Sequence, residues 1–234
     1  MNIFRQYLYI GRCLSRLNST SSSCTNKDLA KRIVWVDLEM TGLDIDKDHI
    51  LEIACLVTDE NLNVVATGPD IVVHQPDDIL SSMNEWCVTQ HGESGLTEAS
   101  RNSKISIKDA EKQVLDFVSN QVPKNKCPLA GNSVYMDRLF IRKYMPQLDS
   151  YLHYRIIDVS SIKELVKRWY KKDYAMLPQK KFMHRSIDDI LESVEELLYY
   201  KNNLNYHRQF NHNMLGSLKW RLEAYLMYIA SNFH

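Results

Sequence analysis

The segment RIVWVDLE, residues 32–39, is rich in β-branched and aromatic residues and is predicted to form a strand. Because successive side chains of a strand point to opposite faces, Trp35, Asp37 and Glu39 are expected to share one face. The valines and the leucine between them are expected to face the other way. Two neighbouring carboxylates repel each other, and burying both without compensation is costly. Hard oxygen ligands suit Mg²⁺ or Mn²⁺, so the segment predicts a metal site or, alternatively, acids that are solvated or paired with basic side chains.

Further strand patterns follow this segment along the chain. Residues 50–58, ILEIACLVT, form a second predicted strand, and residues 62–74 form a third that Gly68 and Pro69 interrupt with a bulge or bend. Their short connections predict an antiparallel meander with the first strand. Two shorter strands are predicted at residues 127–131 and 154–158.

Helical patterns alternate with the later strands. Residues 107–121 place apolar side chains at helical spacing. The other predicted helices cover residues 78–90, 134–144, 160–170 and 186–201. The lysine-rich segment 171–185, with Pro178 as a breaker, is predicted to be a loop. This order of elements predicts one α/β domain over residues 31–203, with helices packed on a mixed sheet.

The overall composition is that of an ordinary globular protein. The chain has 234 residues, 44% of them hydrophobic and 25% charged, and its formal net charge is zero. Binding of a nucleic acid would therefore depend on a local basic site. None of the five cysteines forms a C-x-x-C pair, which argues against a disulfide framework or a thiolate zinc site. No apolar run approaches the roughly 20 residues that a membrane span needs.

Both terminal segments differ from the central domain. Residues 1–30 are rich in arginine and serine and contain no acid before Asp28, a composition typical of a mitochondrial transit peptide. A disordered tail is the alternative. Residues 204–234 place leucines and tyrosines at helical spacing, with charged residues between them. An amphipathic helix that packs on the domain or its partner is expected there, with a membrane-surface or partner-binding helix as the alternative.

Three polar residues outside the first strand could complete a catalytic site. Asp137 follows the turn-like sequence Gly131-Asn132-Ser133 and begins a helix, where the helix dipole alone would also favour an acid. His184 titrates near neutrality, as a general base must, and Asp189 could bind a metal. Alternatively, Ser186 and Asp189 have the spacing of a helix capping box. Each of these residues alone therefore permits a structural as well as a catalytic interpretation.

Together, these residues resemble the motif set of the DEDDh exonucleases, namely Asp37-x-Glu39, Asp137 and His184-x4-Asp189. Longer stretches narrow the resemblance to oligoribonucleases, the small-RNA exonucleases of that superfamily. The matching stretches are WVDLEMTGLD (35–44), MNEWCVTQHGESGL (83–96), GNSVYMD (131–137), YRIIDVSSIKELVKRW (154–169) and HRSIDDILESVEEL (184–197). The resemblance runs in order from about residue 31 to residue 203.

The resemblance implies a fold, a reaction and a cofactor. The fold would be RNase H-like, as in DnaQ-like exonucleases, with a five-stranded mixed sheet flanked by helices. The reaction would be 3′→5′ hydrolysis of short oligoribonucleotides, especially dinucleotides, to nucleoside 5′-monophosphates. Two divalent ions, Mg²⁺ or Mn²⁺, would be held by Asp37, Glu39, Asp137 and Asp189. His184 would accept the proton of the attacking water.

The resemblance also implies substrate-binding residues and a partner. Leu43 would act as an apolar wedge between bases and Trp86 as a stacking platform, although core packing is the alternative for Trp86. The remaining residues implied to contact or enclose short single-stranded RNA are His91, Ser133, Tyr154, Arg155 and Ser160. Arg155 could cap a terminal 5′-phosphate. The family is dimeric, so a homodimer is expected, in which Tyr154 could serve the partner's site.

Two other functions remain open from the residues alone. One is a broader DEDDh exonuclease that acts on DNA or longer RNA. The other is a catalytically silent nucleic-acid-binding module with the same fold, against which the full set of acids argues. The expected location is mitochondrial, with the cytosol as a second site.

Overall fold

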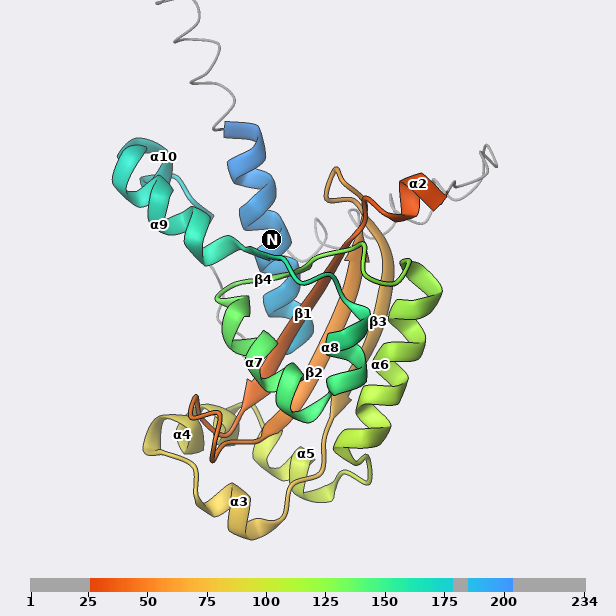
Figure 1. Ribbon diagram of the computed structural model, residues 1–234. Coiled ribbons are helices and arrows are strands. Elements are labelled where there is room, and N and C mark those ends of the chain that lie inside the picture. The colour runs from red at the N-terminus through yellow and green to blue at the C-terminus, as the bar shows by residue number, and fades with distance from the viewer. Residues whose placement is uncertain (1–25, 179–184, 204–234) are drawn as a thin grey trace, which may run out of the picture.

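A five-stranded mixed sheet forms the centre of the molecule in the computed structural model, which describes residues 26–178 and 185–203 (Figure 1). The strands lie in the order β3-β2-β1-β4-β5. Their bounds are Ile33–Met40 for β1, Ile50–Thr58 for β2, Val64–Val72 for β3, Leu129–Gly131 for β4 and Ile156–Asp158 for β5. The first three pair in antiparallel fashion, and β4 and β5 run parallel to β1. The predicted meander and the predicted fold class are confirmed.

The predicted irregularity in the third strand is also present. The register of β2 against β3 shifts between Ala54 and Leu56, opposite the segment of β3 that contains Gly68 and Pro69. Because β3 lies at the edge of the sheet, its proline can lack an N–H without breaking a central ladder.

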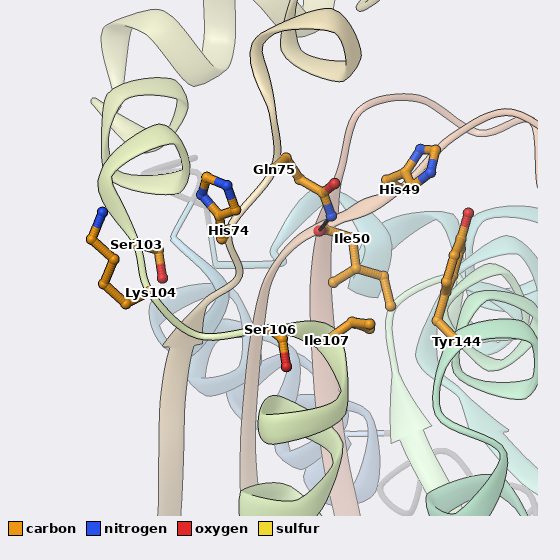
Figure 2. Close-up of a pocket in the computed structure, with 9 residues that line it drawn as sticks. All are labelled: His49, Ile50, His74, Gln75, Ser103, Lys104, Ser106, Ile107 and Tyr144. Atoms are coloured by element: carbon orange, nitrogen blue, oxygen red, sulfur yellow. Dashed lines mark hydrogen bonds between the residues drawn. The ribbon is translucent and has the colours of Figure 1, made fainter.

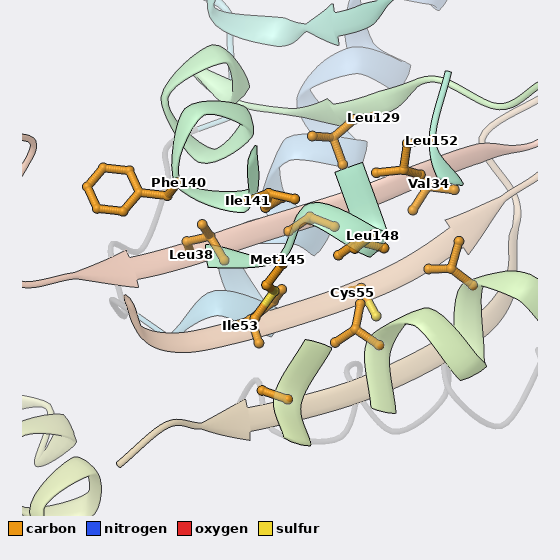
Figure 3. Packing of buried hydrophobic residues seen from close by; sticks show 14 of the residues in the cluster. Val34, Leu38, Ile53, Cys55, Leu129, Phe140, Ile141, Met145, Leu148 and Leu152 are labelled. Carbon is orange, nitrogen blue, oxygen red and sulfur yellow. The ribbon is translucent and has the colours of Figure 1, made fainter. Parts of the chain in front are cut away.

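One face of the sheet packs against α6 (Ile107–Gln121), α7 (Val134–Tyr144) and α8 (Pro146–Tyr151). The alternate residues Val34, Val36 and Leu38 of β1 point into this core, as expected. Figure 3 shows Val34 and Leu38 among the apolar side chains of α7 and α8.

The opposite face packs against α9 (Val159–Trp169) and a final helix over residues 186–203, which passes behind the strands in Figure 1. Trp35 is fully buried on this face, and its indole N–H donates to Thr58 Oγ1 at 3.0 Å. Trp35 therefore lies on this face of the sheet, and the alternation of β1 puts Asp37 and Glu39 on the same face.

The helices in the connections between strands were predicted less accurately than the strands themselves. The single helix expected at 78–90 is divided into α3 (Asp77–Ser81) and α4 (Glu85–Glu93), because Asn84 caps α4 by accepting from Cys87 N–H. α5 (Leu96–Asn102) and α8 were not predicted. The three short helices α3 to α5 gather beyond the end of β1 (Figure 1).

The segment 171–185 was wrongly predicted to be a loop throughout, since it contains α10 (Lys171–Ala175). The hydroxyl of Tyr199 donates to Asp173 O at 2.9 Å, and Tyr174 packs against the apolar cluster that surrounds Trp35 on the face covered by α9. These tertiary contacts hold a helical turn that local sequence does not indicate. A further short helix, α2 (Asn26–Leu29), precedes β1.

Several predicted features lie outside the described residues. They are His184, residues 1–25 of the N-terminal extension and the whole tail at 204–234. Among the described helices, none combines the length and apolar character that crossing a membrane requires.

Candidate active site

Three carboxylates converge where β1 ends. Asp37 and Glu39 come from β1, and Asp189 comes from the first turn of the helix at 186–203. One oxygen of each lies within 4.8 Å of the others, and all three residues are half-buried. Metal–oxygen distances of about 2.0–2.6 Å make this separation suitable for one hard divalent cation. The donor set therefore fits the predicted metal site.

The electrostatic setting of Glu39 supports the same conclusion. Its side chain is only 14% exposed. Burial raises the pKa of Glu39 to about 8, and the nearby acids Asp189, Glu52 and Asp137 add to the rise, while Arg185 opposes it. A carboxylate so destabilised in its charged form is stabilised by a bound cation.

Asp137 lies beside this cluster and contacts the backbone of β1. Its Oδ1 accepts from Leu38 N–H at 2.9 Å, at a position on β1 beyond the residues that pair with β4. Burial raises the pKa of Asp137 to about 7, although the bond from Leu38 opposes the rise. The structure therefore brings the fourth predicted acid to the same strand end, outside the three-carboxylate group.

Close backbone packing places Asp137 there. A Cβ at Gly131, the last residue of β4, would lie 2.9 Å from Val36 O and 3.2–3.3 Å from Val134. Glycine therefore permits the turn into α7 to approach β1. Ser133, which precedes α7, adopts a left-handed conformation with φ of 51°.

His91 lies against the acidic strand end and is 1% exposed. Its Nε2 is 2.9 Å from Met40 O, and its Nδ1 is 3.9 Å from Glu39 Oε2. The predicted substrate-contacting histidine thus packs against a predicted metal ligand.

Leu43 and Trp86 are both exposed, at 65% and 60%. This exposure does not fit the alternative that Trp86 packs in the core. Asp48 braces the loop that carries Leu43, because its carboxylate accepts from Thr41 Oγ1 at 2.9 Å and from Asp44 N–H at 2.8 Å. The loop is therefore structured although its leucine faces outward.

A chain of side-chain hydrogen bonds connects two predicted substrate-binding residues with the helix of Asp189. Ser133 Oγ donates to Ser160 Oγ at 3.1 Å, which donates to Asn132 Oδ1 at 3.2 Å. Asn132 Nδ2 donates to Ser193 Oγ at 2.6 Å, which donates to Asp189 O at 2.7 Å. Sequence reasoning missed Asn132 and Ser193, because only the fold brings them together.

Tyr154 and Arg155 lie on the surface just before edge strand β5. Tyr154 is 74% exposed, and the Arg155 guanidinium lies over its ring, 5.4 Å from the centroid. The structure places neither residue in the acidic cluster.

Glu52 is a further buried acid that sequence reasoning missed. It is fully buried on β2, directly opposite Glu39. It accepts from Arg185 Nη2 at 2.9 Å and from Ser186 N–H at 3.3 Å. Among the described residues, Ser186 Oγ has no hydrogen-bond partner, so the capping-box interpretation of Ser186 and Asp189 is not supported. The signal available in sequence was a glutamate inside the apolar strand ILEIACLVT.

A separate cavity of about 420 Å³ lies between the starts of β2 and α6 and the end of α7 (Figure 2). Its lining includes His49, His74 and Tyr144. None of the predicted site residues lines it. The hydroxyl of Ser106 is engaged by Asp109, and His74 Nδ1 lies 3.2 Å from Ser100 O, so much of its polar lining is already bonded within the protein.

The chain is similar in sequence to known proteins over most of its length. A family model described as "Exonuclease" matches residues 34–197. The chain is 53% identical over 184 residues to human "Oligoribonuclease, mitochondrial", covering 79% of this chain and 78% of that protein. It is 52% identical over 185 residues to the mouse protein of the same name, with the same coverage. It is 49% identical over 175 residues to "Oligoribonuclease" from Pseudoalteromonas atlantica, covering 75% of this chain and 96% of that protein.

Solved structures agree on the fold. A zinc-bound complex of E. coli ExoI with single-stranded DNA has a TM-score of 0.60 at 13% identity, covering 80% of this chain and 45% of that one. S. pombe Pop2p in a Mg²⁺- and Mn²⁺-bound form has a TM-score of 0.58 at 14% identity, covering 73% of this chain and 83% of that one. At such low identity the likeness concerns the arrangement of strands and helices alone.

Proposed function

The chain belongs to the oligoribonuclease family and is a 3′→5′ exoribonuclease that uses divalent metal, and we propose that it hydrolyses dinucleotides in preference to longer RNA, with two bound ions. The observation that carries the proposed site is the convergence of Asp37, Glu39 and Asp189. Because the chain belongs to an exonuclease family, we prefer the enzyme to the alternative of a catalytically silent binding module.

The proposed metal ligands are these three acids together with Asp137. Bound Mg²⁺ or Mn²⁺ would supply the positive charge that lowers the pKa of an attacking water and offsets charge on the leaving oxygen. The buried Glu39 supports this assignment, since its raised pKa reflects an uncompensated acidic site. We propose that His184 is the general base. This assignment rests on the family resemblance alone, because His184 lies outside the described part of the chain.

Short substrates would be selected by contacts at both ends. Leu43 and Trp86, both exposed, would pack against bases, which any base sequence permits. Arg155, Ser133 and Ser160 would bind the terminal 5′-phosphate through charge-assisted and hydroxyl contacts. A phosphate bound in this way would leave no room for further nucleotides on the 5′ side. His91 and Tyr154 remain proposed substrate contacts.

We further propose that the protein is a homodimer. Large apolar side chains are exposed along the sheet edge at β5 and on α9 and the turn after α10. They are Tyr154, Ile156, Leu165, Trp169 and Met176, with exposures from 36% to 74%. Large apolar side chains exposed on consecutive elements in this way favour an interface at this part of the molecule.

A mitochondrial location is proposed as well. The mouse, human and cow relatives carry "mitochondrial" in their names. The arginine- and serine-rich N-terminal extension supports the same location. A cytosolic share of the protein remains a second proposal.

The substrate proposal is tested with 5′-labelled RNAs of two to about seven nucleotides, the range that a capped single-strand site makes relevant. Each length, and a matched DNA series, is digested separately with Mg²⁺ and with Mn²⁺, and kcat/KM is compared. The highest value is expected for the RNA dinucleotide. Equal values for all RNA lengths, or equal cleavage of DNA, would show a broader exonuclease. Asp37→Asn serves as the inactive control.

A further inference from the structure

Glu52 is an ionisable residue with no exposure to water, on the face of the sheet that carries the active site. It lies in β2 directly opposite Glu39 in β1, and the two acids share a face because they form a cross-strand pair. A buried carboxylate is costly unless it is paired and hydrogen-bonded. Its retention beside another acid therefore requires specific partners.

Both oxygens of Glu52 have such partners. Oε1 accepts from Arg185 Nη2 at 2.9 Å, and Oε2 accepts from Ser186 N–H at 3.3 Å. Arg185 Nη2 also lies 4.0 Å from Asp70 Oδ2 on the neighbouring strand β3. Glu52 thus joins the sheet to residues 185–186, which are more than 130 positions away in the sequence.

These two partners lie at the beginning of the helix that carries Asp189. Ser186 belongs to the first turn, in which backbone N–H groups have no partner within the helix. A carboxylate there satisfies such a donor and also interacts favourably with the helix dipole. Asp189 is fixed to the same turn, because its N–H donates to Arg185 O at 3.1 Å.

We propose that Glu52 is a positioning residue for the metal site: by anchoring Arg185 and Ser186 to β2, it places Asp189 beside Asp37 and Glu39. Its engaged oxygens make it a support for the ligands and not a ligand itself. This inference rests on the proposed function in one respect, namely that these three acids bind the metal.

The test measures Mn²⁺ binding by titration calorimetry with the full chain in the absence of RNA, together with the melting temperature in EDTA. In Glu52→Gln, we expect Mn²⁺ affinity to fall 10- to 100-fold, the range that groups supporting metal ligands typically show. With saturating metal, kcat on a dinucleotide should fall while KM changes little, because substrate contacts remain.

The control is Glu111→Gln. Glu111 is also a buried acid that caps a helix other than its own. It lies in α6, and its Oε1 accepts from Gln147 N–H at 2.6 Å and from Leu148 N–H at 3.2 Å at the start of α8. This variant should lose stability in EDTA and keep the wild-type Mn²⁺ affinity. Equal losses of affinity in both glutamine variants would assign the effect to general destabilisation and overturn the proposal.

Arg185→Gln distinguishes a positioning role of Glu52 from a purely electrostatic effect on the metal site. It also provides a second test if Glu52→Gln does not fold. Removal of a positive charge near the site should strengthen Mn²⁺ binding if Glu52 and Arg185 act only through long-range electrostatics. Loss of the anchor should weaken it if they position Asp189. Stronger or unchanged binding in Arg185→Gln therefore overturns the proposal.

The Asp37→Asn variant keeps this test distinct from the metal assignment itself. If wild type and Asp37→Asn bind Mn²⁺ equally, the metal site is assigned wrongly. If Asp37→Asn loses binding while Glu52→Gln and Arg185→Gln retain it, the site is correct and the role of Glu52 is wrong.

Discussion

Glu39 combines burial with neighbouring negative charge, and it therefore influences how the metal-free protein responds to pH. Its pKa is raised from 4.5 to about 8 in the folded protein. The folded state thus binds this proton more tightly than the unfolded state does. The resulting stabilisation is complete below about pH 4.5 and is lost as pH rises through about 8.

Glu39→Gln should remove this loss, because the amide stays neutral at every pH. In EDTA at pH 8, we expect the variant to be more stable than wild type by roughly 4 kcal/mol, since each tenfold difference in proton affinity between the folded and unfolded states corresponds to about 1.4 kcal/mol. The difference should be small at pH 4.5. Urea unfolding at both pH values measures it, and Mg²⁺ at pH 8 should stabilise wild type but not the variant. A variant no more stable than wild type at pH 8 would contradict the assigned burial effect.

Arg155→Ala should impair catalysis while leaving stability nearly unchanged. The side chain is exposed, so we expect a change in unfolding free energy within about 0.5 kcal/mol. Loss of a charge-assisted contact to the 5′-phosphate, worth about 1.5–3 kcal/mol, should lower kcat/KM on a 5′-phosphorylated dinucleotide roughly 10- to 100-fold. Arg168→Ala, which removes an exposed arginine paired with Glu164 on α9, is the control. Comparable kcat/KM for Arg155→Ala and wild type would exclude the phosphate-capping role.

At the scale of elements, the chain of hydrogen bonds through Asn132 joins the turn between β4 and α7 to the helix at 186–203. Asn132→Ala removes two of these bonds, each contributing about 0.5–1.5 kcal/mol. We expect unfolding free energy to fall by about 1–3 kcal/mol and kcat on dinucleotides to fall with it. Asn102→Ala is the control, since Asn102 is bonded only within α5 in the described contacts. If Asn132→Ala matches this control in both measurements, the chain does not couple the two elements.

Elements with strong internal patterns were predictable from sequence. The bounds of β2, α6 and α7 follow the expected ranges, because β2 is an almost unbroken apolar run, both helices place apolar residues on one face, and a capping box begins α6. α8 was not predictable, since its first N–H groups are satisfied by Glu111 from another helix. The site divides in the same way. Strand periodicity predicted that Asp37 and Glu39 share a face, whereas Glu52, Asn132 and Ser193 acquire their partners only through the fold.

At the scale of the whole molecule, the exposed apolar surface around α9 predicts self-association. Trp169 is 66% exposed at the end of that helix. Trp169→Glu should convert a dimer into a monomer, because a charge would have to be desolvated in the interface. Light scattering coupled to size-exclusion chromatography measures the mass. Val65→Glu, at an exposed position on the opposite sheet edge, should remain dimeric. A monomeric wild-type protein at micromolar concentration would exclude the proposed homodimer.

The register of β1 against β2 has a consequence for refolding. The pairing runs without interruption from Ile33 to Glu39, and it shifts only between Glu39 and Met40. A slip by one residue would turn Asp37 and Glu39 into the apolar core and Leu38 towards the metal site. A chain trapped with such a pairing could be compact and helical yet inactive. Recovery of nuclease activity after denaturation is therefore a probe for the correct alignment of these two strands, which total helix content would not detect.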